Sequence, residues 1–370
     1  MKAADTRISE SEAVIISGNK AEKQAEESDK TKSRAKTARE NPCKGPVNNR
    51  KVAVIGCGFV GSSIAFTLMQ RSIFSEMVLI DRDRKKAEGE ALDISHGLPY
   101  SAPMEIYAGD YDNIADAALI VIAAGANQKQ GETRLDLIDK NLAIFSQIIP
   151  EIKKRDCQGI LLVVTNPVDI LTYAAMKMSG FSPQRVIGSG TVLDTARLKY
   201  LIGRSLDVDA RSVHAVIIGE HGDSELAVWS GANVSGIDLD HFCELRGIDH
   251  YKDTTQRIYT EVRDSAYEII QRKGATYYGI AMAVAKIAES ISRDEHSILP
   301  VSTLLSGEYG IEGLCLSIPS VVGSKGVEKV LEIPLSGTEQ RELTASAKAL
   351  AAAVEHADRA AEALQNEKVM

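Results

Sequence analysis

Residues 51–61 read KVAVIGCGFVG. Its apolar run leads directly into Gly56-Cys57-Gly58-Phe59-Val60-Gly61, which has the spacing GxGxxG. Between a strand and a helix, the first glycine permits a tight turn and the second lets backbone N–H groups approach a pyrophosphate. The third lets the helix pack closely on the strand. We therefore expect a dinucleotide to bind at Gly56, Gly58, Phe59, Val60 and Gly61; the alternative is an ordinary glycine-rich turn.

Asp81 ends the next apolar run and follows Gly61 by 20 residues. A carboxylate at that place accepts hydrogen bonds from the ribose hydroxyls of the adenosine. It also repels the 2′-phosphate of NADP, so we expect NAD as the cofactor. The basic residues of 82–86 could soften this preference, although a solvent-exposed charge run is the simpler interpretation.

The alternation of strand and helix continues beyond the motif. Almost continuously apolar runs are typical of strands buried on both faces of a parallel sheet, and they occur at 51–56, 77–81, 119–123 and 159–164. Helical stretches between them occupy 60–70, 84–96, 135–154 and 168–178. The pattern predicts an α/β fold with a doubly wound parallel sheet of the Rossmann type.

The pattern changes near residue 182. Helices are expected at 193–206, 251–273 and 276–290, antiparallel strands at 213–218, 297–305 and 314–322, and a long helix at 338–365. We therefore expect a dinucleotide domain over 49–182 and an α+β substrate domain over 183–366.

The composition narrows the function classes. The chain has 370 residues, 44% of them apolar, and a net charge of −8, which argues against nucleic acid or anionic membrane as the main partner. Five cysteines without a CxxC pair predict a reduced cytoplasmic protein with no metal site. No apolar stretch approaches the roughly 20 residues of a membrane span.

The first 48 residues are expected to be a disordered extension. They contain no aromatic residue and carry more basic than acidic side chains, so they cannot bury enough apolar surface to offset the cost of ordering them. One hypothesis is that translation starts at Val47 on a GUG codon, so that residues 1–46 are absent from the native protein. Otherwise they form a dispensable tail.

Three polar segments carry candidate catalytic residues. Residues 127–134 (NQKQGETR) follow a buried strand, where ligands sit in doubly wound sheets, although an ordinary surface loop is an equal alternative. Asp194 and Arg197 share a helical face, and spacing alone favours an exposed ion pair. His221 lies in a glycine-flanked loop after a strand and suits proton transfer, but spacing does not pair it with Asp194.

Residues 49–354 resemble the lactate/malate dehydrogenase superfamily, most closely its bacterial L-lactate dehydrogenases. The motifs that carry the resemblance, in the order of that family, are GCGFVG, LIDRD, AAGANQKQGETRLDL, TNPVD, GSGTVLDTARL, GEHGDSE, KGATYYGIA and SIPSVVGSKG. The resemblance implies reversible hydride transfer between L-lactate and NAD, giving pyruvate and NADH. The broader alternatives are another L-2-hydroxyacid dehydrogenase, a malate dehydrogenase, or an NAD-binding regulator without turnover.

The resemblance also implies roles for the catalytic candidates. His221 is the acid–base group, and Asp194 holds its imidazole in the required tautomer. Arg197 clamps the substrate carboxylate, and Arg134 polarises the carbonyl when its loop closes. No metal is required for this chemistry.

Further roles come from the same resemblance. Asn166 contacts the cofactor and the reacting oxygen, and Thr276 borders the substrate side chain. Malate enzymes of the family carry arginine where Gln128 stands. A neutral amide leaves a second substrate carboxylate unpaired in a desolvated site, so Gln128 predicts pyruvate rather than oxaloacetate.

Regulation and assembly are expectations of the same kind. The resemblance implies a homotetramer, and relatives activated by fructose 1,6-bisphosphate have cations where Lys199 and His214 stand. Arginine is more frequent than lysine at the first of these places. The alternative is that Lys199 is a solvated helix residue and His214 packs at the start of a strand.

Overall fold

The computed structural model describes residues 47–126, 132–248 and 251–367, with side chains 251–253 and 361–367 excepted. The described residues form one compact unit. The predictions for residues 1–46 and for Gln128 fall outside the described residues. The predicted boundary near residue 182 stays a prediction.

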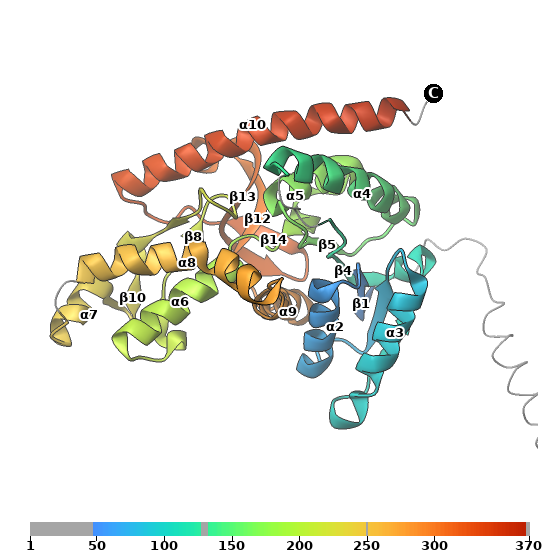
Figure 1. Ribbon diagram of the computed structural model, residues 1–370, viewed down its shortest axis with the longest axis horizontal. Coiled ribbons are helices and arrows are strands. Elements are labelled where there is room, and N and C mark those ends of the chain that lie inside the picture. Colours follow the sequence, from blue (N-terminus) through green and yellow to red (C-terminus); the bar gives the residue numbers. More distant parts are fainter. Residues whose placement is uncertain (1–46, 127–131, 249–250, 368–370) are drawn as a thin grey trace, which may run out of the picture. The chain divides into compact units, whose positions relative to one another are not determined.

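A nine-stranded sheet forms the centre of this unit (Figure 1). Six of its strands are parallel and follow the order β3-β2-β1-β4-β5-β6. Their bounds are β1 Asn48–Ile55, β2 Glu76–Ile80, β3 Glu105–Ala108, β4 Ala117–Ile122, β5 Ile160–Val163 and β6 Val186–Gly188. This is the strand order of a dinucleotide-binding sheet. The predicted α/β class and doubly wound sheet are confirmed, while the short strands β3 and β6 escaped prediction.

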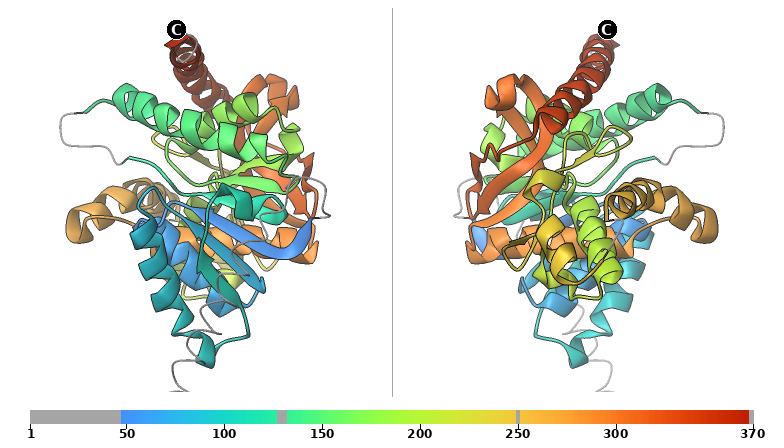
Figure 2. Two further views of the ribbon diagram at one scale, coloured as in Figure 1. Left: turned by 90° about the vertical axis from the view of Figure 1, so that its right-hand side faces the viewer. Right: turned by 90° about the vertical axis from the view of Figure 1, so that its left-hand side faces the viewer.

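Helices cover both faces of the sheet (Figures 1 and 2). One face packs against α2 (Phe59–Arg71), α3 (Arg84–Ser95) and α9 (Tyr278–Arg293), and the other against α4 (Arg134–Lys154), α5 (Val168–Ser179) and α10 (Gly337–Glu367). Successive side chains of a strand point to opposite faces. Val52 and Val54 accordingly enter the first core, and Ala53 and Ile55 enter the second.

Three antiparallel strands extend the parallel sheet. They are β12 (Ser297–Ser306), β13 (Glu312–Gly323) and β14 (Gly326–Val330), and β12 joins β6 where Ser302 pairs with Gly188. The antiparallel pairing of β12 and β13 confirms the prediction. Their continuity with the parallel strands was not predicted, because a single residue pair makes the junction.

The third core cluster lies among α6 (Val192–Leu206), α7 (Leu239–Leu245) and α8 (Tyr251–Lys273). Short strands complete this region: β7 Val213–His214, β8 Ile217–Ile218, β9 Leu226–Ala227, β10 Asn233–Val234 and β11 Ile237–Asp238. The prediction of one strand over 213–218 is wrong. β7 pairs with β10 while β8 pairs with β9, so the chain leaves one small sheet and enters another.

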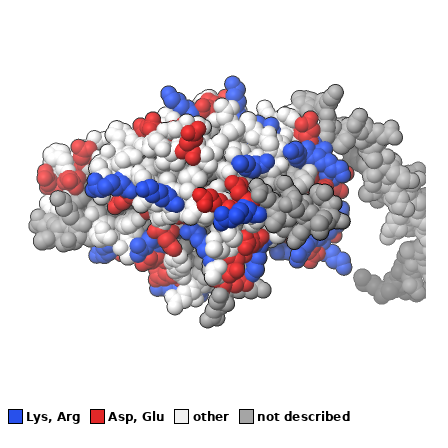
Figure 3. Space-filling view, turned by 90° about the horizontal axis from the view of Figure 1, so that it is seen from above, with Lys and Arg blue, Asp and Glu red and all other residues white. Residues whose placement is uncertain are grey.

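The distribution of surface charge and the character of the helices are relevant to binding of nucleic acid or a membrane. Acidic and basic side chains are intermingled on the face shown in Figure 3. Within the described part of the chain, no helix combines the length and apolarity needed to cross a bilayer.

Gly61 provides a stability test of the strand–helix packing. A Cβ at Gly61 would lie 1.7 Å from the carbonyl oxygen of Gly56, so alanine must push α2 away from β1. We expect Gly61→Ala to lower the free energy of unfolding by about 2 kcal/mol or more. Gly89 is a matched control in α3, because its Cβ would meet nothing within 4 Å. Gly89→Ala should raise stability by up to about 1 kcal/mol. Equal effects in denaturant unfolding would contradict this packing argument.

Candidate active site

The turn between β1 and α2 has the geometry of an anion site. Gly56 has φ +98°, and a Cβ there would lie 2.5 Å from the backbone nitrogen of Ala124, so only glycine fits. Gly58 precedes the first turn of α2 without giving it a side-chain cap, and a Cβ at Gly58 would meet open space. Backbone N–H groups at such a helix start suit a pyrophosphate.

Asp81 lies against the same turn. Its carboxylate accepts hydrogen bonds from the backbone N–H groups of Cys57, at 2.7 Å, and Asp83, at 2.9 Å. Phe59 is 72% exposed at the start of α2 and stacks on Tyr277, with 5.5 Å between ring centroids. The open turn and the fixed carboxylate together fit a dinucleotide with free ribose hydroxyls.

The ends of β4 and β5 are tied together by Asn141. This fully buried side chain of α4 accepts a hydrogen bond from Ala126 N at 2.7 Å and donates one to Asn166 O at 2.7 Å. Asn166 itself is exposed at the end of β5. Asn141 therefore fixes the backbone at Asn166, a role that the sequence did not reveal.

The buried carboxylate of Asp194 joins the two other catalytic candidates. Its Oδ1 accepts a hydrogen bond from Arg197 Nη1 at 2.7 Å, and its Oδ2 lies 2.6 Å from His221 Nδ1. Asp194 is 2% exposed, so this is not the exposed ion pair that spacing alone favours. His221 keeps 22% of its side chain exposed. The imidazole is thus held through Nδ1, which leaves Nε2 for a substrate.

The charges of this group shift each other's pKa. Burial lowers the pKa of His221, but the charge of Asp194 and its hydrogen bond outweigh burial, with smaller contributions from Glu225 and Asp169 in their ionised forms, and raise the pKa to about 9. Burial raises the pKa of Asp194, but His221 and Arg197 outweigh burial and lower it. An ionised Asp194 and a protonated His221 therefore coexist at neutral pH.

The backbone around His221 is fixed from three sides. Asp169, buried in the first turn of α5, accepts a hydrogen bond from His221 N at 2.7 Å. Gly219 exchanges backbone hydrogen bonds with Ser317 of β13, at 2.9 and 3.0 Å. On the opposite side, Ser346 Oγ of α10 accepts a hydrogen bond from Glu220 N at 3.0 Å. These contacts fix the loop that carries His221.

Arg134 and Thr276 lie at the margins of this arrangement. Arg134 begins α4, is 45% exposed, and forms an ion pair with Glu220, the residue before His221. Thr276 is half-buried just before α9. The structure thus brings Arg134 to the loop of His221, while Gln128 lies outside the described residues.

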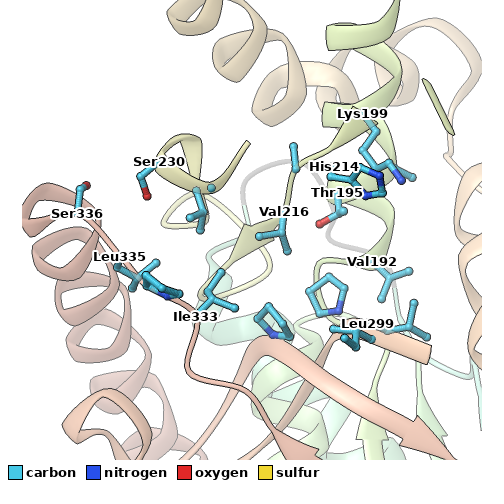
Figure 4. Close-up of a pocket in the computed structure, with 18 residues that line it drawn as sticks. Val192, Thr195, Lys199, His214, Val216, Ser230, Leu299, Ile333, Leu335 and Ser336 are labelled. Carbon is cyan, nitrogen blue, oxygen red and sulfur yellow. The ribbon is translucent and has the colours of Figure 1, made fainter. Parts of the chain in front are cut away.

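Lys199 and His214 line one cavity of about 880 Å³. Lys199 belongs to α6 and His214 to β7, and both lie on the same side of the cavity in Figure 4, opposite Ser336. Most of the remaining wall is apolar and includes Val192, Val216, Leu299, Pro300, Ile333 and Leu335.

Two buried acids beside His221 were missed by the sequence analysis. Asp169 stands in TNPVD and Glu225 in GEHGDSE, motifs in which other residues were assigned. Both side chains are buried, Glu225 being 4% exposed. Asp169 opens an apolar helical stretch, which is a signal for a buried acid, whereas Glu225 follows a polar run that gives no such signal.

Comparison with known proteins covers nearly the whole described chain. The NAD-binding domain of lactate/malate dehydrogenase matches residues 50–188, and the α/β C-terminal domain of lactate/malate dehydrogenase matches residues 191–360. The chain is 53% identical to an L-lactate dehydrogenase of Acetivibrio thermocellus over 78% of this chain and 92% of that protein. It is 52% identical to one of Priestia megaterium over 81% and 94%.

Solved structures agree with these relatives. A lactate dehydrogenase from a Medee basin deep-sea metagenome library has a TM-score of 0.82 and 44% identity, covering 84% of this chain and all of that one. The minor L-lactate dehydrogenase of Enterococcus mundtii has a TM-score of 0.80 and 41% identity, covering 83% and 98%. With both domains matched in sequence and the fold matched in space, this chain belongs to the lactate/malate dehydrogenase family.

Proposed function

We propose that this chain catalyses the reversible oxidation of L-lactate by NAD, which gives pyruvate, NADH and a proton. The observation that carries the proposal is the buried carboxylate of Asp194, with Arg197 on one oxygen and His221 on the other. This arrangement supplies a cation for the substrate carboxylate and an imidazole for the hydroxyl proton. The relatives named L-lactate dehydrogenase and the NAD-binding domain match support the same activity.

His221 is the proton donor for pyruvate reduction. Its pKa of about 9 keeps the imidazole protonated at neutral pH. Because Asp194 occupies Nδ1, the transferable proton is on Nε2 and passes to the carbonyl oxygen. In lactate oxidation the same nitrogen takes the hydroxyl proton, so that reaction requires the neutral imidazole.

The arginines bind and polarise the substrate. Arg197 uses Nη1 for Asp194, and the rest of its planar guanidinium can form a bidentate pair with the substrate carboxylate. Arg134, delivered by closure of its loop, polarises the carbonyl as negative charge develops. For this, Arg134 must exchange its ion pair with Glu220 for the substrate.

The glycine turn and Asp81 hold the cofactor. Backbone N–H groups at Gly58 and after it would bind the pyrophosphate, Asp81 would accept hydrogen bonds from the ribose hydroxyls, and Asn166 would contact the cofactor near the reacting oxygen. When bound, the nicotinamide supplies or accepts the hydride. The protein excludes water from the reacting groups and orients them.

Substitutions of the imidazole and its partner test the proton step. His221→Asn and Asp194→Asn should each lower kcat for pyruvate reduction roughly 100-fold or more, because proton transfer loses its donor or the donor's orientation. The Kd of NADH should stay unchanged. The exposed His241→Asn is the control and should keep full activity. Wild-type turnover in either active-site variant would remove that residue from the mechanism.

Pyruvate is the preferred substrate because Gln128 cannot neutralise a second carboxylate. An unpaired charge in a desolvated site costs several kcal/mol. Longer apolar 2-oxo acids are rejected less strongly, because a methylene is worth only ~1–3 kcal/mol. A broader L-2-hydroxyacid specificity is therefore the main alternative, and malate dehydrogenase activity is the weaker one.

Gln128→Arg tests this specificity. The added cation should raise the ratio of kcat/KM for oxaloacetate over pyruvate by about 100-fold or more. Gln130→Arg adds the same charge two residues away and should leave the ratio near the wild-type value. An unchanged ratio in Gln128→Arg would show that residue 128 does not face the substrate side chain.

A regulatory phosphate site is part of the proposal, with a homotetramer in the cytoplasm as its setting. Lys199 and His214 line the same cavity, and both can carry positive charge. Fructose 1,6-bisphosphate bound there would favour the active assembly by differential binding. The alternative is that Lys199 is a solvated helix residue and that His214 packs at the start of a strand.

Pyruvate saturation assays near neutral pH test whether fructose 1,6-bisphosphate activates the enzyme. Fructose 1,6-bisphosphate should lower the half-saturating concentration of pyruvate in the wild type by about fivefold or more. Lys199→Gln should remove most of this response without changing kcat at saturating pyruvate. Identical pyruvate curves with and without the bisphosphate would refute activation.

A further inference from the structure

Glu225 is a second buried acid in the catalytic group, and the proposed mechanism gives it no role. It lies directly before β9 and is 4% exposed. One polar side-chain atom of each of Asp194, His221 and Glu225 lies within 4.8 Å of the other two. A buried acid at this distance from a catalytic pair must affect its charge.

The contact between Glu225 and Asp194 requires a proton. An oxygen of each carboxyl group lies within 4.8 Å of the other, and two ionised carboxylates, which are acceptors only, repel each other at this distance. Asp194 already has Arg197 and His221 on its two oxygens. Among the residues that the structure describes, no ion pair joins Glu225 to a cation. The proton of the acid pair therefore belongs on Glu225.

The surroundings of Glu225 favour its neutral form. Asp194 and Arg197 of α6 and His221 of the preceding loop are the charged groups that face the Glu225 carboxyl. Tyr259 of α8 donates its hydroxyl to the backbone carbonyl oxygen of Glu225. Burial and then the charge of Asp194 raise the pKa of Glu225 to about 8, against the lowering effect of His221 and Arg197. At neutral pH the carboxyl is therefore mostly protonated.

We propose that Glu225 is a positioning residue, a neutral carboxyl that donates a hydrogen bond to Asp194 and so holds that carboxylate on His221. The proposal rests on the proposed lactate dehydrogenase function and adds a third member to its proton-handling group. With Glu225 neutral, Asp194 is the one negative charge between the cations Arg197 and His221. Ionisation of Glu225 adds a second charge, which makes His221 hold its proton more tightly and draws Arg197 away from a substrate carboxylate.

Infrared difference spectra of the wild type test the protonation directly. Between pH 6 and pH 10, the carbonyl band of a neutral carboxylic acid should disappear with a midpoint near the Glu225 pKa of about 8. Glu225→Gln should lack this change. Glu339→Gln, which removes another buried acid, should retain it because hydrogen bonds from Ser230 and Ser336 outweigh burial and lower the pKa of Glu339. A wild type without the band change, or a Glu225→Gln variant that keeps it, would overturn the proposal.

Kinetics at pH 7 test the positioning. Glu225→Gln can still donate a hydrogen bond to Asp194, so kcat for pyruvate should stay within about threefold of the wild type. Glu225→Leu has a similar size but no donor, and its kcat should fall roughly tenfold or more with an unchanged Kd for NADH. Equal kcat values in the two variants would contradict the role.

The infrared titration decides the case if either variant fails to fold. Turnover of pyruvate by the wild type is measured separately, so failure of the proposed function is distinguishable from failure of the Glu225 proposal.

Discussion

The active site depends on one buried negative charge, the carboxylate of Asp194. A charge removed from water is destabilising unless cations and hydrogen bonds compensate for it. Arg197 comes from the next turn of the same helix, so local sequence supplies it. His221 must be brought by the fold, and Asp169 together with Ser346 holds its loop in place. Elements from both halves of the chain thus converge on this carboxylate.

The sheet makes that convergence possible. The glycine turn and Asp81 follow the carboxyl ends of the parallel strands β1 and β2. The antiparallel part of the sheet begins where Ser302 of β12 pairs with Gly188 of β6. A Cβ at Gly188 would lie 2.4 Å from Thr172 Oγ1, so a larger residue at this junction meets α5 directly. The dinucleotide turn and the loop that carries His221 therefore belong to one continuous framework.

Sequence predicted the parts of this framework that are locally encoded. GxGxxG, the long apolar runs and the amphipathic helices each have a short-range physical cause, and the structure confirms them. The pairing of His221 with Asp194 spans 27 residues, and only the family resemblance predicts it. The break between β7 and β8 and the contacts of Asn141 and Glu225 depend on which segments meet in space. Sequence periodicity does not predict such tertiary contacts.

In the free enzyme, Asp194 keeps His221 protonated at neutral pH. The most direct test is an NMR titration of the His221 imidazole in the wild-type protein without ligands. We expect a midpoint near the raised pKa of about 9. A midpoint near 6.5, the ordinary value for histidine, would contradict it, because Asp194 would then not be stabilising the imidazolium.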